Sequence, residues 1–324
     1  MLVEMTMAYR KSAALFAFVE SKAPLYLSTE NGKTAEQLAQ LCKVSQKRFS
    51  RLLDYMHSLN VLTKKEDKFY LTEQCSSLAD QNSFETLNIK FELNPANWDA
   101  WSQYYLSLSE MNEKSAFELS HREPFFDYVS HEHNKSLKVI FDNLMSKNTE
   151  IMSEHIIENM PLGGIHSIMD IGGGQGTLAK DIKRQYPYIQ CHVMDLYDFD
   201  KKESDGVTFI KGDFFSTIPA EYGAYCMKNV LHNWADNKSV EILSNIRKAM
   251  RKDSVLYVIE MVKEPGDAAS ESFDLYMDIA VSGKSRSQAE FESIAEQAGL
   301  SITNAYKMKF SLTGSSQYII EMKK

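Results

Sequence analysis

The sequence predicts an α/β protein in which a doubly wound, mostly parallel sheet with an antiparallel last strand follows an N-terminal winged helix. Three observations predict this fold. Strand-like and helix-like segments alternate after residue 161, as in a parallel sheet covered by helices. Residues 34–72 show two short helical patterns and then a ribbon pattern, which is the order of a winged helix. The chain of 324 residues is also longer than a typical domain of about 100–200 residues.

These patterns divide the chain into three expected parts: an all-α winged-helix domain with a short ribbon at 1–80, a helical region at 81–160, and the sheet domain at 161–324. In the first part, Thr34 and Gln37 have the spacing of a capping box at a helix start. A winged helix raises the question of DNA binding. Basic residues barely outnumber acidic ones in this part, so a dimerisation module is favoured.

The composition excludes several classes of protein. The formal net charge of −8 argues against a general nucleic-acid binder, which needs a basic face. The four cysteines are scattered and have no histidine at metal-ligand spacing, so we expect reduced cytoplasmic thiols and no metal. No apolar run approaches the roughly 20 residues of a membrane span. Charged residues border the apolar patch Ala13–Val19, which favours a helix face over a secretory signal.

The helical region is rich in aromatic residues. Most of them are expected in the core, and some are suited to line a pocket for a flat ligand; they are Trp98, Trp101, Tyr104, Tyr105, Phe117, Phe125, Phe126, Tyr128 and Phe141. A linker is expected at Pro161–Gly164.

Seven strands are predicted in the last part, with helices at Leu178–Tyr186 and Asn237–Arg251. The strands are Ile165–Ile171, Ile189–Asp195, Val207–Lys211, Ala224–Val230, Ser254–Val262, Ile302–Phe310 and Gln317–Met322. Only a short turn at 313–316 separates the final two. Because no crossover helix fits there, the last strand must run antiparallel.

The strongest local signal is the run MDIGGGQG at 169–176, between a strand and a helix. Its glycines allow a sharp turn and a close approach of the backbone to a ligand. Gly172, Gly174 and Gly176 are too closely spaced for the dinucleotide-binding pattern, and their spacing is typical of a methyltransferase loop. Asp195 ends the next strand, where a carboxylate can accept hydrogen bonds from ribose hydroxyls.

Further polar and aromatic residues follow the third and fourth strands. Asp213 and Phe214 come after one strand and are suited to an adenine amino group and ring. The next strand leads into the run KNVLHNWAD at 228–236. Because parallel strands end at one edge of the sheet, all these residues are expected to converge there.

With these motifs the chain resembles the class I O-methyltransferases of the caffeate, hydroxyindole and bacterial phenazine type. The resemblance covers nearly the whole length, and the ordered set DIGGGQG, MDL, GDFF, KNVLHNW and DLYM followed by GKSRS carries it. It implies a Rossmann-like sheet, an intertwined homodimer built by the winged helix, and transfer of a methyl group from S-adenosylmethionine, with S-adenosylhomocysteine as product. It implies no nucleic acid, membrane or metal.

The resemblance also implies roles for individual residues. Lys228 would reach the cofactor and Trp234 would pack near it, beside the loop of Gly172 and Gly174, ribose-binding Asp195, and adenine-flanking Asp213 and Phe214. His232 matches the general base, and Glu260 matches an acid that orients it. The expected substrate contacts, for a small aromatic acceptor, are Trp98, Phe141, Asn143, Met145 and Met277.

The chemistry suits a histidine base. A phenol has a pKa of about 10 and an imidazole of about 6.5, so an imidazole can remove the proton as methyl transfer proceeds. Two departures weaken the resemblance: Asn233 stands where an Asp often follows the base, and Ser285 replaces the family's second acid. Asp278 lies nearby in sequence but at a normally apolar position, and it is not assigned the missing role.

Two other functions stay open. A cofactor-binding relative can catalyse a non-methylating reaction, which the mass of the product would reveal. A winged-helix regulator that senses a ligand would bind DNA with a strong dependence on salt. The sequence does not fix the acceptor or distinguish oxygen from nitrogen or carbon methylation.

Overall fold

A computed structural model describes residues 1–109, 114–196, 199, 202–309, 312, 314 and 316–324. The chain folds as two compact units. The first contains residues 1–99 and 129–147, and the second contains residues 100–128 and 148–324. The three-part division at residues 80 and 160 stays a proposal.

The first unit begins with helix α1 (Leu2–Glu20), followed by β1 (Lys33–Thr34), α2 (Ala35–Cys42), α3 (Gln46–Ser58), β2 (Leu62–Lys65) and β3 (Lys68–Leu71). The capping box of Thr34 and Gln37 is confirmed. The strands form an antiparallel sheet in the order β1-β3-β2. The all-α description is therefore wrong, because β1 pairs with the ribbon. Apolar residues of α1, α2, α3 and the ribbon form one core.

The helical prediction for the middle of the chain is confirmed over its described residues. It contains α4 (Phe84–Glu92), α5 (Pro95–Ser107), α6 (Ala116–His121), α7 (Phe125–Ser130) and α8 (Lys135–Glu158), with short 3-10 turns at Glu73–Ala79 and Glu132–Asn134. Serine hydroxyls cap α4 and α6. In the second unit, α6 packs against α11 (Ala268–Val281).

The second unit is built on an eight-stranded sheet in the order β10-β11-β9-β8-β4-β5-β7-β6. The strands are β4 (Ser167–Ile171), β5 (Gln190–Asp195), β6 (Glu203–Ser204), β7 (Val207–Lys211), β8 (Ala224–Lys228), β9 (Val255–Met261), β10 (Ser301–Lys307) and β11 (Gln317–Lys323). Strands β4, β5, β7, β8 and β9 pair in parallel, and β11 runs antiparallel to β9. The prediction of a mostly parallel sheet with an antiparallel last strand is therefore confirmed.

Most strand ends coincide with the predicted ones or differ from them by one or two residues. The predicted strand Ala224–Val230 ends earlier, at Lys228, because Asn229 adopts a left-handed conformation with φ 56°. The two-residue strand β6 was not predicted. The end of the predicted strand at Phe310, and Thr313 and Ser315 of the predicted turn, lie outside the described residues.

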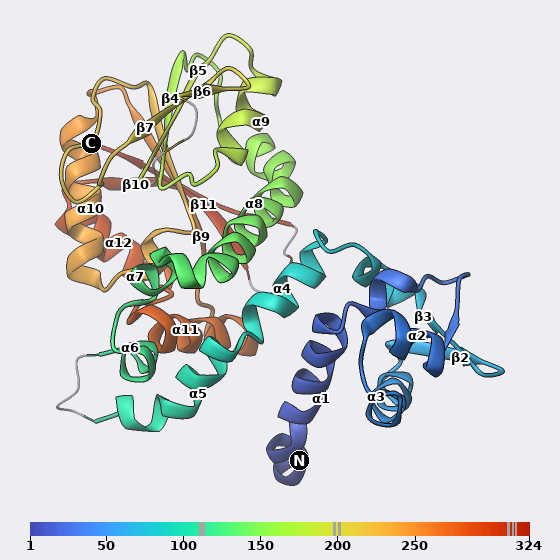
Figure 1. The fold of residues 1–324 in the computed structure, drawn as a ribbon. Helices are drawn as coiled ribbons and strands as arrows, with labels where there is room; N and C mark the ends of the chain where they lie inside the picture. Colours follow the sequence, from blue (N-terminus) through green and yellow to red (C-terminus); the bar gives the residue numbers. More distant parts are fainter. Residues whose placement is uncertain (110–113, 197–198, 200–201, 310–311, 313, 315) are drawn as a thin grey trace. The chain divides into compact units, whose positions relative to one another are not determined.

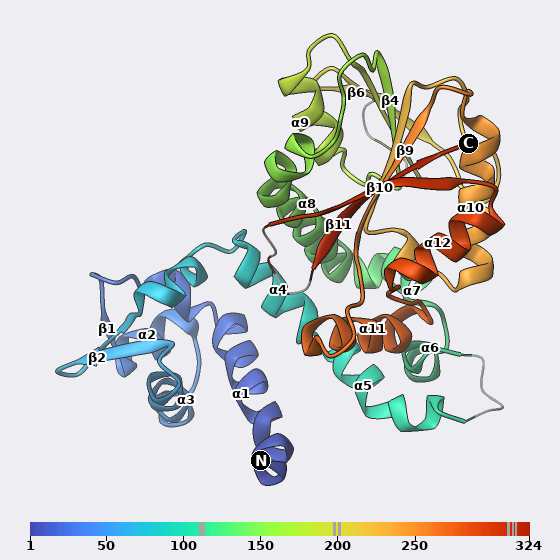
Figure 2. The ribbon, with the colours of Figure 1, turned by 180° about the vertical axis from the view of Figure 1, so that it is seen from behind.

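Helices cover both faces of this sheet (Figures 1 and 2). Helices α10 (Asp236–Ala249) and α12 (Gln288–Gln297) lie on one face, and α9 (Thr177–Gln185) lies on the other with the later part of α8. Alternate residues along each strand enter two separate cores. For example, Met169 joins the core of α10 and α12, while Ile168 joins the core of α8 and α9. This double cover leaves the edge at the carboxyl ends of the strands to carry a site.

Candidate active site

The glycine loop begins where β4 ends, at the carboxyl edge of the parallel strands. Gly172, Gly174 and Gly176 all have positive φ, at 69°, 55° and 75°, which is the left-handed region that glycine adopts without steric cost. The Gly174 N–H donates to Asp195 Oδ2 at 2.9 Å. The loop is thereby fixed to the end of β5, and the two predicted cofactor elements lie together.

The room for a side chain differs between Gly172 and Gly174 of this loop. A Cβ on Gly174 would meet no atom within 4 Å, whereas one on Gly172 would lie 2.9 Å from Val230 and 3.8 Å from Phe214. The backbone at Gly172 therefore packs against the segments that follow β7 and β8. The open side at Gly174 leaves room for a ligand beside the Asp195 carboxylate.

The predicted adenine-flanking residues lie on a short turn after β7. Asp213 Oδ1 accepts a hydrogen bond from the Phe215 N–H at 2.8 Å, so the carboxylate shapes its own turn. The rings of Phe214 and Phe215 are tilted against each other with centroids 5.0 Å apart, and Trp234 meets Phe215 edge-on at 4.7 Å. Trp234 thus supports the phenylalanine pair that borders the glycine loop.

Two ionisable groups lie in the strands next to the loop, Asp170 in β4 and Lys228 at the end of β8. Burial lowers the pKa of Lys228 to about 8, although Glu260 and Asp170 act to raise it. The Lys228 ammonium donates to Asn148 Oδ1 at 2.8 Å. Burial raises the pKa of Asp170 to about 7, and its Oδ1 has no hydrogen-bond partner among the residues that the structure describes. An unsatisfied buried carboxylate oxygen is costly in a folded protein.

His232 and Glu260 form the most tightly bonded pair of the site. His232 lies on the 3-10 turn η4 (Leu231–Asn233) after β8, and Glu260 lies near the end of β9. The distance from His232 Nδ1 to Glu260 Oε2 is 2.6 Å. Glu260 is fully buried and His232 is 9% exposed. An ionised carboxylate only accepts hydrogen bonds, so Nδ1 carries the proton and Nε2 is left as the basic nitrogen.

The other oxygen of Glu260 holds the turn itself. Oε1 accepts from the backbone N–H groups of Val230, Leu231 and His232, at 2.9, 2.8 and 3.3 Å. One carboxylate therefore orients the imidazole and the backbone that carries it. Charge-assisted bonds of this kind are about twice as strong as neutral ones.

Sequence reasoning missed three residues beside this pair. Phe273 of α11 presents its ring edge-on to His232 at 5.2 Å. Gly283 passes so close to the turn that a Cβ would overlap the His232 carbonyl oxygen. Asn148 of α8 pairs with Lys228. The glycine in the GKSRS segment was a visible signal. Phe273 directly precedes the DLYM run on α11 but is not part of it, and Asn148 lies in a helix that carries no motif.

The structure shows what Ser285 and Asn233, the two departures from the family pattern, and the nearby Asp278 contact. Ser285 is buried, and its hydroxyl donates to the Met261 carbonyl at 3.4 Å. Its N–H donates to Asp274 Oδ1 at 2.9 Å. Asp278 accepts a hydrogen bond from Tyr104, and burial raises its pKa. Asn233 donates to the Asn229 carbonyl at 3.3 Å.

The predicted substrate residues belong to different units. Trp98, Phe141, Asn143 and Met145 lie in the first unit, and Met277 lies in the second. Met277 is 6% exposed, on the same helix as Phe273. Phe141 meets Phe91 at 5.4 Å inside the first unit. Their role as substrate contacts stays a prediction.

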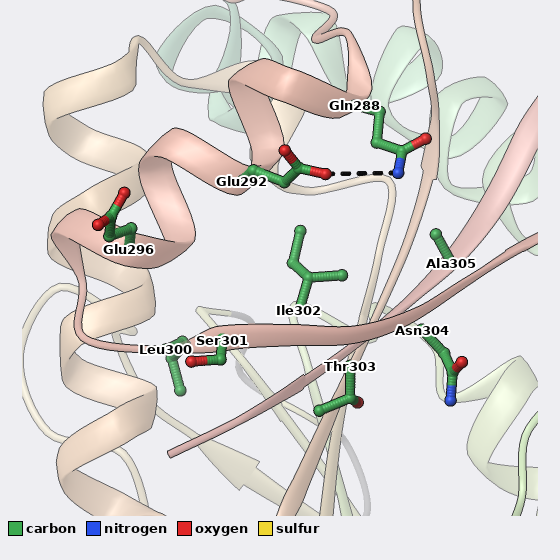
Figure 3. Close-up of a pocket in the computed structure, with 9 residues that line it drawn as sticks. All are labelled: Gln288, Glu292, Glu296, Leu300, Ser301, Ile302, Thr303, Asn304 and Ala305. Carbon is green, nitrogen blue, oxygen red and sulfur yellow. Dashed lines mark hydrogen bonds between the residues drawn. The ribbon is translucent and has the colours of Figure 1, made fainter.

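A separate groove lies between α12 and the edge strand β10. Figure 3 shows its lining, which includes Glu292 and Glu296, and its volume is about 550 Å³. None of the predicted site residues lines it. Over the described part of the chain, no group of His, Cys, Asp or Glu side chains could hold a metal ion. No described helix combines the length and apolar character that a bilayer crossing requires.

Comparison with known proteins identifies the family. The sequence profile of the O-methyltransferase domain matches residues 101–301. A 3-O-methylredipecamine 2-O-methyltransferase of Carapichea ipecacuanha is 30% identical over 82% of this chain and 80% of its own length. A mitomycin biosynthesis 6-O-methyltransferase of Streptomyces lavendulae is 28% identical over 90% of this chain and 86% of its own.

Solved structures have the same fold. A mitomycin 7-O-methyltransferase superposes with a TM-score of 0.89 at 24% identity, covering 100% of this chain and 97% of that one. Human N-acetylserotonin methyltransferase, in complex with S-adenosylmethionine, gives 0.85 at 20% identity, covering 100% and 96%. The sheet domain therefore has the class I methyltransferase fold. The chain belongs to the S-adenosylmethionine-dependent O-methyltransferases of the secondary-metabolite type.

The residues present fit this cofactor on three counts. The space beside Gly174 is open. The Asp195 carboxylate lies at the end of β5, where hydroxyl groups are commonly bound in such sheets. The buried Asp170 oxygen, which has no hydrogen-bond partner among the described residues, belongs to a carboxylate beside Gly173 of the same loop, and a donor from a ligand or a water would satisfy it.

Proposed function

We propose that this chain methylates a hydroxyl group on a small aromatic molecule and that His232 is the general base. The observation that carries the proposal is the 2.6 Å bond between His232 Nδ1 and Glu260 Oε2. It lies at the carboxyl edge of a methyltransferase sheet, next to the glycine loop. A base in that place removes the proton of the acceptor as its oxygen takes up the methyl group.

The roles of the residues follow from the chemistry. S-adenosylmethionine, when bound, supplies a methyl group that its sulfonium already activates. The chain must then align the acceptor and take one proton. His232 Nε2 takes that proton, and Glu260 stabilises the imidazolium that forms. The edge-on ring of Phe273 keeps the imidazole in one orientation and helps to exclude water.

We assign cofactor binding to the sheet edge. Gly172 and Gly174 would line the methionine part, Asp195 would bind the ribose, and Asp213 and Phe214 would flank the adenine. Lys228 would act from beneath the loop, and Trp234 would support Phe214. The family resemblance adds Trp98, Phe141, Asn143, Met145 and Met277 as substrate contacts, and most of these side chains are apolar or aromatic, as suits an aromatic acceptor.

We also infer that the first unit contains a winged-helix module that forms a homodimer. Helix α1 and the Met1 residue before it expose several apolar side chains, at Met1, Leu2, Val3, Met5, Met7 and Tyr9. Exposed apolar patches on folded proteins commonly mark protein interfaces. Sedimentation equilibrium tests this point, since a chain that stays monomeric at high concentration would contradict it.

The proposed activity is tested in two steps. Calorimetric titration with S-adenosylmethionine should show binding that Asp195→Ala weakens strongly. Incubation with a set of simple phenols and catechols should then give products heavier by one methylene group, and His232→Ala should form this product far more slowly while it still binds the cofactor. Binding without any mass gain on any acceptor would favour a non-methylating reaction. Full activity in His232→Ala would remove the histidine from its role.

A further inference from the structure

The turn that carries His232 is held on its carbonyl side as well as on its N–H side. Glu260 accepts its N–H groups. On the other side, the Lys284 N–H donates to the His232 carbonyl at 2.8 Å. Arg286 donates from Nη1 to the Leu231 carbonyl at 3.0 Å and from Nη2 to the Trp234 carbonyl at 2.8 Å. The carbonyls of Leu231 and Trp234, two of the acceptors of Arg286, lie on either side of His232 in the sequence.

Arg286 uses all five of its N–H donors. Besides the two carbonyls of the turn, Nε donates to Asp236 Oδ1 at 2.9 Å, Nη2 to Ser239 Oγ at 2.9 Å and Nη1 to the Lys284 carbonyl at 3.4 Å. Asp236 and Ser239 both belong to α10. The planar guanidinium therefore joins the turn to the first residues of the helix that follows it.

The backbone of Arg286 is fixed to the strand that carries Glu260. Arg286 forms a parallel bridge with Val262, and the Lys263 N–H donates to its carbonyl at 2.8 Å. The backbone at residues 260–263 therefore carries Glu260 and also pairs with Arg286. Glu260 accepts from the N–H groups of the turn, and Arg286 donates to its carbonyls. This arrangement fixes the distance between the His232 ring and the Glu260 carboxylate.

The burial of this guanidinium is costly. The Arg286 side chain is 0% exposed, and its one carboxylate partner, Asp236, is 48% exposed. Burying a charge costs several kcal/mol unless partners compensate for it. Four of the five acceptors are neutral oxygens, and two of these belong to the turn of His232. A purely apolar side chain would fill the space but could not hold those carbonyls.

We propose that Arg286 is a positioning residue that acts through His232: it holds the turn so that Nδ1 stays on Glu260 and Nε2 points at the acceptor. This inference rests on the proposed role of His232 as the base. Lysine cannot replace it, because an ammonium is a point charge with three donors and lacks the fixed fork that reaches several acceptors in one plane.

The test compares Arg286→Lys with Arg247→Lys. Arg247 is the matched control because its Nε also donates to a backbone carbonyl, that of Gly299, at 2.8 Å, and it lies in the last turn of α10, at the opposite end of that helix from the His232 turn. The first readout needs no acceptor. A proton in a bond as short as that of His232 Nδ1 resonates far downfield in the ¹H NMR spectrum. We expect this signal to be lost or shifted in Arg286→Lys and kept in Arg247→Lys.

The second readout is a double-mutant cycle on methyl transfer to catechol. Arg286→Lys should lower kcat on the order of 100-fold, as a misplacement of about 1 Å does, with the affinity for S-adenosylmethionine unchanged by calorimetry. In the His232→Ala background it should cause no further loss. Equal losses in both backgrounds, or an unchanged downfield signal, would overturn the positioning role.

The outcomes separate the two proposals. If His232→Ala is fully active, the proposed function fails, and the NMR signal still decides whether Arg286 positions the ring. If Arg286→Lys does not fold, Asp236→Asn replaces it, because that carboxylate is half exposed and contacts the guanidinium only at Nε, besides an exposed ion pair with Lys284. A weaker effect in the same direction, again absent with His232→Ala, supports the proposal, and no effect on signal or rate contradicts it.

Discussion

Replacing Glu260 by glutamine should separate the stability of the site from its chemistry. Three N–H groups point at Oε1, so the amide oxygen of Gln must take that place and its NH₂ group must face His232. The NH₂ group can only donate. Nδ1 must therefore accept, and its proton must move to Nε2. The nitrogen that should act as the base would then already carry a proton.

The expected magnitudes differ sharply for rate and stability. In the Ser-His-Asp template the equivalent carboxylate-to-amide change lowers kcat by about 10⁴, which corresponds to about 5.4 kcal/mol of activation free energy. For stability, each charge-assisted bond that becomes neutral loses about 1 kcal/mol. The loss is offset because a buried charge, which costs several kcal/mol to desolvate, is removed. We therefore expect a change in the free energy of unfolding of no more than about 2 kcal/mol.

The assay is methyl transfer from labelled S-adenosylmethionine to catechol, beside calorimetry of cofactor binding and urea denaturation. Glu264→Gln is the control, because that glutamate lies just beyond the same strand but bonds Lys307 and Tyr318 rather than the histidine. A Glu260→Gln enzyme that keeps its rate within about tenfold, where the template loses 10⁴, would refute the assignment of the tautomer.

Three other substitutions test neighbouring features. Gly283→Ala adds a Cβ that overlaps the His232 carbonyl oxygen, and the displaced turn should lower kcat by about 100-fold without weakening cofactor binding. Asn229→Val forces a β-branched residue to φ 56° and should lower the free energy of unfolding by about 1–3 kcal/mol in urea, whereas Asn229→Gly should cost far less. Asp170→Asn should remove a pH dependence. Burial raises the pKa of Asp170 to about 7, so the folded chain holds this proton more tightly than the unfolded chain. This group then lowers wild-type stability by about 3 kcal/mol as the pH rises from 5 to 8, and the variant should not show this loss in thermal melts at the two pH values.

Each of these has an outcome that would count against it. A Gly283→Ala enzyme of normal rate would mean that the turn tolerates displacement. Equal stability of the Val and Gly variants at 229 would show that the left-handed backbone is not under steric control. Parallel pH profiles for wild type and Asp170→Asn would mean that the carboxyl group titrates as it does in the unfolded chain.

The sequence predicted the sheet edge well because its signals are local. Each predicted cofactor residue ends a strand or lies within a few residues after one, and strand ends in a parallel sheet meet by topology. The capping box of Thr34 was visible for the same reason, since its partners are three residues apart. The two-residue strands β1 and β6 escaped because so short a segment has no period to detect.

The contacts that Glu260 and Arg286 make with the His232 turn could not be predicted from local sequence signals. The Leu231 carbonyl and the Arg286 guanidinium are 55 residues apart in sequence, and Glu260 is 28 residues from the histidine that it orients. Their meeting depends on the pairing of β8 with β9 and on the course of the chain after α11. The resemblance to a family supplied Glu260 as a partner of the imidazole. It did not supply the three backbone bonds of the same carboxylate.

Under the proposed role of His232, these contacts account for the serine at position 285. The Ser285 hydroxyl bonds the Met261 carbonyl, so that position stabilises the backbone beyond Glu260 rather than the imidazole. The orientation of His232 then depends on one carboxylate and on a turn that cannot shift, because its N–H groups and its carbonyls are both held. A second acid would add charge beside the ring. On this proposal, the rigid turn aligns the His232 ring without a second acid. The loss of rate in Arg286→Lys then measures how much the rigid turn contributes to that alignment.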